Sequence, residues 1–191
     1  MKEIEIKFKI AKPNLIRKIL KKHKAKFIGR AFERTVKFDT KNNDLQRAGK
    51  FLRVRTGFKS VITFKRKIKS KPRSREISLR GKKFKEREEI ELEISEPEKM
   101  KVILENLGFT KKWIMEKYRE KWQWGSAEIV IDKLPFGNFI EIEGSKKTIQ
   151  KVAKLLGLRL ADGITATYWG LWKDYCRRKG IKEENIIFKK R

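Results

Sequence analysis

The stretch Met1-Lys-Glu-Ile-Glu-Ile-Lys-Phe-Lys-Ile10 alternates charged and apolar residues, and this alternation decides how the chain begins to fold. Successive side chains of a β-strand point to opposite faces, so the pattern predicts a strand. Its apolar face belongs to a core. Its other face carries Glu3, Glu5, Lys7 and Lys9. Carboxylates beside ammonium groups on an anchored strand suit a divalent cation bound next to an anion, so we expect this strand to form part of an active site.

The same pattern returns in the second half of the chain. Arg87-Glu-Glu-Ile-Glu-Leu-Glu-Ile94 alternates in the same way, and an amphipathic helix is predicted after Pro97 as another is after Pro13. We infer an internal duplication. One domain over residues 1–191 then contains two halves, at about 1–68 and 85–180, and a basic connection at 69–84.

Composition limits the class of protein and its partners. The 191 residues include 52 Lys and Arg against 24 Asp and Glu, and the formal charge of +28 attracts polyanions such as nucleic acid, anionic lipid or polyphosphate. The single cysteine, Cys176, excludes an internal disulfide, and the single histidine, His23, leaves no Cys and His cluster for zinc. No apolar run approaches the roughly 20 residues of a membrane span, and no secretion signal is evident. We therefore expect a cytoplasmic protein that does not enter membranes.

The remaining segments predict the fold. Strands are expected at 26–39, 50–56, 60–67, 109–124, 126–132 and 138–143, and helices at 13–22, 97–107, 146–156 and 165–178. About eight strands with one charged face each cannot make an ordinary sandwich, whose inward faces are apolar. We therefore predict an α+β fold in which a closed eight-stranded antiparallel β-barrel has a polar lumen and helices packed outside.

Three apolar sets are expected in the core. The strand at 87–94 is expected to bury Ile90, Leu92 and Ile94. The helix at 97–107 is expected to bury Met100, Ile103, Leu104 and Leu107. On the last helix, aromatic residues at helical spacing more often pack a helix onto a sheet than stack on a base. These residues are Tyr168, Trp169, Trp172 and Tyr175.

Glutamates on the predicted polar faces come as Glu-x-Glu pairs. The pairs lie at positions 3 and 5, 89 and 91, and 141 and 143. Alternate residues of a strand are roughly 6.5 to 7 Å apart, so both carboxylates of a pair can reach one hydrated cation. Clustered carboxylates otherwise raise one another's pKa. Ligation by oxygen alone favours Mg²⁺ or Mn²⁺, and the surplus of Lys and Arg fits a triphosphate.

Seven motifs then follow one another in the order typical of a known family. They are Glu3-x-Glu5-x-Lys7, Phe38-Asp-Thr40, Gly49-Lys-Phe-Leu-Arg-Val-Arg55, Thr63-Phe-Lys65, Lys117-Tyr-Arg119, Ile131-Asp132 and Gly137-Asn-Phe-Ile-Glu-Ile-Glu143. From residue 3 to about 175 the chain resembles the CYTH superfamily, the triphosphate tunnel metalloenzymes, which includes class IV adenylyl cyclases and thiamine triphosphatases. The resemblance implies an eight-stranded antiparallel tunnel that binds triphosphates with magnesium or manganese.

The resemblance also implies a role for each site residue. The metal ligands would be Glu3, Glu5, Glu141, Glu143 and Asp132. The substrate-binding residues would be Lys7, Arg53, Arg55, Lys65, Lys117 and Arg119. Arg87 is added to this set because alternation places it on the polar face of its strand. The catalytic residues would be Glu91, Asp132 and Lys65, with the two acids aiding a second ion or the attacking group. Catalysis would consist of positioning and charge neutralisation.

The chain departs from the family pattern in one motif, and its residues are compatible with three functions. Many members carry Lys-Ser-Tyr where this chain has Ala166-Thr-Tyr168, which removes an expected phosphate contact. Lys173 or a residue of the basic connection at 69–84 is a candidate substitute. The first function is a metal-dependent triphosphatase for inorganic triphosphate, ATP or thiamine triphosphate, acting as a monomer or homodimer. The second is a class IV adenylyl cyclase, in which the ribose 3′ hydroxyl of ATP attacks the α-phosphorus and releases pyrophosphate. The third is a non-catalytic binder of polyphosphate or RNA.

Overall fold

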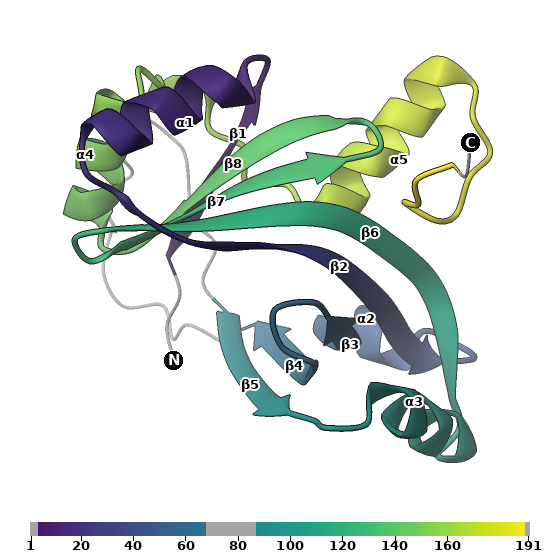
Figure 1. Cartoon of the computed structure of the whole chain (residues 1–191). Coiled ribbons are helices and arrows are strands. Elements are labelled where there is room, and N and C mark those ends of the chain that lie inside the picture. Colours follow the sequence, from purple (N-terminus) through teal and green to yellow (C-terminus); the bar gives the residue numbers. More distant parts are fainter. Residues whose placement is uncertain (1–3, 68–86, 190–191) are drawn as a thin grey trace, which may run out of the picture.

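The structure is a computed structural model that describes residues 4–67 and 87–189. Its strands form one antiparallel sheet of eight strands (Figure 1). The strands are β1 (Glu5–Ile10), β2 (Lys26–Thr40), β3 (Lys50–Thr56), β4 (Val61–Lys67), β5 (Arg87–Glu93), β6 (Phe109–Trp124), β7 (Ala127–Leu134) and β8 (Gly137–Glu143). Each strand predicted from the sequence is present.

Helices connect or follow these strands. They are α1 (Pro13–Lys22), α2 (Asp44–Arg47), α3 (Pro97–Asn106), α4 (Lys146–Leu155) and α5 (Tyr168–Lys179), with a 3-10 turn at Leu160–Asp162. Both α1 and α3 begin with proline, whose missing N–H needs no partner in a first turn. The α4 and α5 helices begin after hydroxyl caps, Ser145 and Thr167. Among the described residues, none of the helices has the length and apolar composition needed to cross a membrane.

The order of strands across the sheet is β1-β8-β7-β6-β2-β3-β4-β5. The two longest strands, β2 and β6, pair with each other in the middle of the sheet. The β1 strand pairs with β8, the last strand of the chain, and β5 pairs with β4. The sheet therefore joins strands from the beginning and the end of the sequence in one continuous polar face.

The prediction of a closed barrel is corrected by this order. Within residues 4–67 and 87–189, β1 and β5 are the two ends of the sheet and do not pair with each other. Register shifts near Phe27 and Lys37 accompany the curvature of β2 and β6 (Figure 1), as expected for bulges that bend strands. Alternation of charge requires water on one face of the sheet. A strongly curved sheet meets this requirement as well as a closed barrel does.

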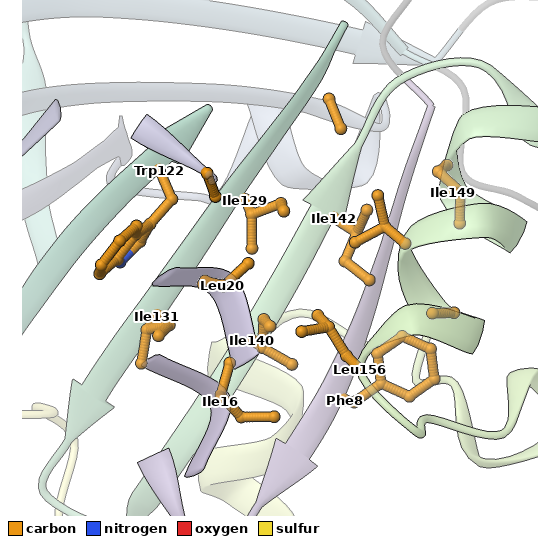
Figure 2. Close-up of a cluster of buried hydrophobic side chains, with 14 of the residues drawn as sticks. Phe8, Ile16, Leu20, Trp122, Ile129, Ile131, Ile140, Ile142, Ile149 and Leu156 are labelled. Atoms are coloured by element: carbon orange, nitrogen blue, oxygen red, sulfur yellow. The ribbon is translucent and has the colours of Figure 1, made fainter. Parts of the chain in front are cut away.

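The apolar face of β1, β8 and β7 is covered by α1 and α4 (Figure 1). Buried side chains of these strands pack in one cluster with Ile16 and Leu20 of α1, Ile149 of α4 and Leu156, which follows α4 directly (Figure 2). Period-two burial on the strands and helical spacing on the helices produce this cluster. The two helices therefore bury their apolar faces against the sheet and expose their polar faces to solvent.

The last helix packs against the opposite face of the sheet. Tyr168 and Trp172 of α5 are buried in a second cluster with Phe139 of β8 and Trp113 of β6. The prediction that α5 contributes Tyr168 and Trp172 to the core is confirmed. Trp169 corrects that prediction in part, because it is half-buried and lines a cavity described below.

Several apolar residues expected in the core are exposed instead. Ile90 and Leu92 of β5 are 56% and 63% exposed, and Ile103 and Leu107 near the end of α3 are also exposed. Leu104 is buried as expected. The β5 strand lies at one end of the sheet, and no helix of the described chain buries its outer face. Alternation identifies an apolar face, but it does not say what covers that face.

Candidate active site

The polar face of the sheet lines a cavity of about 780 Å³, to which all eight strands and the start of α5 contribute. Ten residues predicted for the site line it: Glu5, Lys7, Arg53, Arg55, Lys65, Glu91, Lys117, Arg119, Glu141 and Glu143. The predicted ligand Glu3 lies outside the described residues, and the side chain of Arg87 does too. The alternation of each strand thus brings charges that are distant in sequence to one space.

Asp132 lies beneath the cavity and is fully buried. Its carboxylate accepts two hydrogen bonds from Arg119, at 2.7 Å from Nε and 2.5 Å from Nη2. It also accepts one from Lys117 Nζ at 3.1 Å and one from the Tyr168 hydroxyl at 2.8 Å. Burial alone would raise the pKa of Asp132, but Arg119 and Lys117 hold it below its usual value. Asp132 is a predicted metal ligand, and in the structure its carboxylate binds two cations that line the cavity, Lys117 and Arg119.

Glu141 joins this cluster to the first strand. Its carboxylate contacts Lys7 Nζ at 2.5 Å and Arg119 Nη2 at 2.6 Å. Burial alone would raise the pKa of Glu141, but Lys7 and Arg119 hold it far below its usual value. The ammonium of Lys7 also lies 4.4 Å from the centre of the Tyr168 ring, a cation–π contact. Lys7 is therefore held by Glu141 and the Tyr168 ring, and Arg119 is held by Glu141 and Asp132.

Glu33 of β2 is a site residue that the sequence analysis missed. It is 2% exposed and lies 3.4 Å from Lys117 Nζ, 3.8 Å from Arg119 Nε and 4.0 Å from Arg55 Nη1. Burial alone would raise the pKa of Glu33, but these three cations hold it below its usual value. Among residues 4–67 and 87–189, its Oε2 atom has no hydrogen-bond partner, and neither has the buried Nε of Arg55. Glu33 therefore links the cations of β6 to those of β3 by charge alone.

A second group of cations lies on β3 and β4. Arg53 donates from Nε to the Thr63 hydroxyl at 3.2 Å, and that hydroxyl donates to Glu91 at 2.9 Å. Arg55 Nη2 lies 3.5 Å from the same carboxylate, and Lys65 pairs with Glu89. Burial and the neighbouring Arg55 lower the pKa of Arg53. The cavity thus has cations on two walls, one from β1 and β6 and one from β3 and β4.

Three glutamates lie side by side on β1, β8 and β7. Glu5 is directly opposite Glu143, and Glu143 is directly opposite Glu128. Burial raises the pKa of Glu143, and the like charges of Glu128, Glu5, Glu141 and Glu89 raise it further. Lys121 lies 3.4 Å from Glu128. In the part of the chain that the structure describes, no Lys or Arg pairs with Glu5 or Glu143.

These two carboxylates fit a hard divalent cation in their chemistry. Their oxygens are the ligands that Mg²⁺ and Mn²⁺ prefer, and a cation would offset the repulsion that raises the pKa of Glu143. Within residues 4–67 and 87–189, no three acidic, histidine or cysteine side chains converge into a complete ligand set. Glu128 was not predicted as part of this group, although it follows the same alternation as Val130 and Asp132 on β7.

One wall of the cavity is aromatic. Trp113 and Trp169 stack with their ring centres 4.9 Å apart and their planes 10° apart, and Phe51 lies beside Trp113. Lys37, which the sequence analysis missed, lines the cavity and donates to Gln46 at 2.6 Å. Lys173, the suggested substitute for the lysine absent at Ala166, lies over the Trp169 ring at 5.5 Å.

The sequence and the fold were also compared with known proteins. The family model for the CYTH domain matches residues 1–162. The chain belongs to the CYTH domain family. The resemblance indicated by the seven motifs is thereby confirmed, and the cavity described above lies on the polar face of the sheet of a CYTH protein.

Individual CYTH relatives agree with this assignment. A Methanocaldococcus jannaschii protein named as a proposed adenylate cyclase is 34% identical to this chain over 158 residues. The match covers 82% of this chain and 84% of the relative. A solved structure from Pyrococcus horikoshii is 27% identical, with a TM-score of 0.68 over 87% of this chain and 96% of that one. A Hippeastrum protein at 21% identity, with a TM-score of 0.53 over 99% of this chain and 92% of that one, shares the fold. That protein is known as a proposed adenylyl cyclase with a dominant triphosphatase activity.

Proposed function

We propose that this CYTH protein is a divalent-metal-dependent hydrolase of triphosphates. One observation carries the proposal: a single cavity holds cations on two walls and also two carboxylates, Glu5 and Glu143, that have no Lys or Arg partner among the described residues. Cations alone would favour any polyanion, whereas carboxylates repel a polyanion unless a metal lies between them. A triphosphate with its metal satisfies both sets of groups.

The two cationic walls would bind the phosphate chain. Arg53, Arg55 and Lys65 would contact it from one side, and Lys7, Lys117 and Arg119 from the other. Arginine offers forked N–H donors that match phosphate oxygens, and buried cations act strongly because water screens them little. Phosphoryl transfer depends on such positioning and neutralisation, since little covalent chemistry is left to the protein.

The metal would be held by Glu5 and Glu143, with the predicted ligands Glu3 and Glu141 near them in sequence. When bound, Mg²⁺ or Mn²⁺ neutralises phosphate oxygens and makes the terminal phosphorus more open to attack. Asp132 would act as a positioning residue, because its carboxylate is occupied by Arg119, Lys117 and Tyr168.

Glu91 would orient the attacking water. Its side chain is 36% exposed and lines the cavity, so it can accept a hydrogen bond from a water molecule beside the substrate. The water oxygen would bond to the terminal phosphorus while the bond from that phosphorus to the bridging oxygen breaks. Orthophosphate and the shortened diphosphate then leave. The triphosphatase activity named for the Hippeastrum neighbour supports this choice of reaction.

A specific observation also favours a second function, adenylyl cyclisation. The stacked Trp113 and Trp169 give a planar base a surface beside the phosphate-binding cations. With ATP placed so that its α-phosphorus faces the ribose 3′ hydroxyl, the same cations would support release of pyrophosphate. The name of the Methanocaldococcus relative agrees with this function.

Product analysis distinguishes the two functions. The protein is incubated with inorganic triphosphate, ATP or thiamine triphosphate, each with Mg²⁺, with Mn²⁺ or with a chelator. Release of orthophosphate in the presence of metal supports hydrolysis, and cyclic AMP with pyrophosphate supports cyclisation. No turnover of any of the three substrates with either metal would overturn both.

A pair of variants tests the metal site separately. The double variant Glu5→Gln and Glu143→Gln keeps the shape of the side chains but removes both negative charges from the proposed metal site. We expect its metal-dependent turnover to fall by a factor of about 100 or more. The control is Glu93→Gln, which removes a carboxylate from the exposed end of β5 and should turn over like the parent.

A further inference from the structure

The polar faces of α1 and α4 form a surface that carries only positive charge. From residue 12 to residue 26 the chain has seven Lys and Arg, and from 145 to 159 it has five, with no Asp or Glu in either stretch. The two helices belong to one buried cluster and lie side by side (Figure 1). We name this surface the lysine layer, and we define it by Lys18, Lys21, Lys22, Lys147, Lys151 and Lys154, all of which are exposed.

The lysine layer is not simply the consequence of a basic chain. The α3 helix of the same protein mixes its charges, and Glu98 pairs with Lys101 at 2.5 Å while Glu105 pairs with Lys111 at 2.7 Å. On α5, Asp174 pairs with Arg177 at 2.9 Å. The six lysines of the layer have no such partner among the described residues. Like charges on adjacent helical turns repel, so this segregation costs stability unless an anion offsets it.

We propose that the lysine layer binds the phosphate backbone of a nucleic acid. A backbone presents regularly spaced anions over a length greater than one helix, which suits unpaired lysines on two adjacent helices. No exposed aromatic ring is needed for such binding, because lysine contacts to phosphate read no sequence. The binding is therefore sequence-independent and strongly dependent on salt.

Two other anionic partners fit the layer less well. A helix that lies in a membrane surface must turn an apolar face into the lipid, but α1 and α4 bury Ile16, Leu20, Ile149 and Val152 against the sheet. An acidic protein partner would be anchored by apolar contacts at the centre of an interface, and the exposed faces of α1 and α4 are mainly lysine. Phosphate groups on a nucleic acid require neither.

This inference goes beyond the proposed function and is independent of it. The helices cover the apolar face of β1, β8 and β7, while the cavity lies on the polar face of the same strands. Nucleic acid bound at the lysine layer therefore leaves the cavity accessible. Loss of one activity should not remove the other.

The test measures fluorescence anisotropy of a labelled DNA duplex of about 20 base pairs, between about 50 and 200 mM NaCl. One triple variant carries Lys18→Glu, Lys21→Glu and Lys22→Glu, and another carries Lys147→Glu, Lys151→Glu and Lys154→Glu. The control triple, Lys41→Glu, Lys179→Glu and Lys182→Glu, changes the net charge equally at exposed positions outside the layer. Circular dichroism melts establish that all three variants fold.

We expect each layer variant to bind the duplex at least about tenfold more weakly than the parent. The slope of log affinity against log salt should shrink by roughly 2 to 3, about 0.9 for each lost phosphate contact. The control triple and Arg55→Ala, which alters the cavity, should retain most of the affinity. The proposal is overturned if the control loses as much as the layer variants do, or if the parent prefers vesicles rich in phosphatidylserine. Triphosphate turnover by the layer variants should match the parent, so a failure of this proposal differs from a failure of the proposed hydrolase.

Discussion

Substitution of Asp132 by Asn tests the cluster beneath the cavity floor. Asn keeps the shape of the side chain but removes the charge that accepts hydrogen bonds from Arg119, Lys117 and Tyr168. Its NH₂ group would also face donors that need an acceptor. Because the carboxylate is fully buried, water cannot replace it. Removing one partner of a buried ion pair costs about 3 to 5 kcal/mol, and we expect a loss of free energy of unfolding in this range.

Urea unfolding at pH 7 measures this loss. The control is Glu93→Gln, which removes a carboxylate from the end of β5. Its 2.7 Å pair with Lys59 is exposed, so we expect little change in the free energy of unfolding. If Asp132→Asn cost less than about 1 kcal/mol, the reasoning from burial and hydrogen bonding would be refuted.

The effect of pH provides a second check on the same residue. Arg119 and Lys117 hold the pKa of Asp132 below its usual value in the folded state, whereas an unfolded aspartate has a pKa of about 3.9. The charge therefore stabilises the fold fully above about pH 4, and this stabilisation is lost as the pH falls through the folded pKa. The stability difference between parent and Asp132→Asn should shrink on acidification. A difference that stayed constant from pH 7 to pH 2 would contradict the assignment.

Four further substitutions follow from individual contacts. Gly57→Ala would place a Cβ 2.6 Å from Glu33 Cγ, and urea unfolding should show a loss of about 1 to 3 kcal/mol, whereas Gly170→Ala, with its nearest contact at 3.5 Å, should show none. Trp169→Ala should raise the KM for ATP about 5- to 100-fold and leave that for inorganic triphosphate unchanged, since only the former has a base to stack. Arg17→Ala breaks two contacts to the buried Glu120, at 2.8 and 2.9 Å, and should cost about 1.5 to 3 kcal/mol in urea unfolding, whereas Lys59→Ala breaks an exposed pair and should leave the urea midpoint close to that of the parent. Glu143→Gln should raise the urea midpoint of the protein in a chelator, because burial and neighbouring like charges both disfavour the charged form and raise the pKa of this carboxyl, and it should reduce the rise in Tm on adding Mg²⁺ or Mn²⁺.

Sequence alternation predicts strands and their faces well in this chain. Lys7 is opposite Glu141 in the sheet, and the alternation of the two strands alone predicts both residues on the polar face. The prediction succeeds because a strand has only two faces, and a run such as Phe139-Ile-Glu-Ile-Glu143 leaves no doubt about which is polar. Helix boundaries were also close to those observed, since prolines begin α1 and α3.

Two kinds of feature escaped the sequence analysis for physical reasons. Glu33 and Lys37 stand in a run that alternates as Glu33-x-Thr35-x-Lys37-x-Asp39, so the signal was present, but β2 lacks the Glu-x-Glu pattern that drew attention elsewhere. Whether the sheet closes depends on which strands pair, and whether Ile90 is buried depends on which elements pack against β5. Period-two alternation carries no information about that, because it is a property of a single strand.

The arrangement of glutamates at one end of the cavity is more informative than their number. Like charges directly opposite one another on adjacent strands are destabilising, and the register places Glu5 against Glu143 and Glu143 against Glu128. The chain has 52 Lys and Arg, so a lysine or arginine could have been the residue opposite each of these glutamates. The same cavity shows that such pairing is feasible, since Glu141 contacts both Lys7 and Arg119. Glu5 and Glu143 thus impose a cost on the fold that a bound divalent cation would remove, which is why we assign the metal to them rather than to the fully paired Asp132.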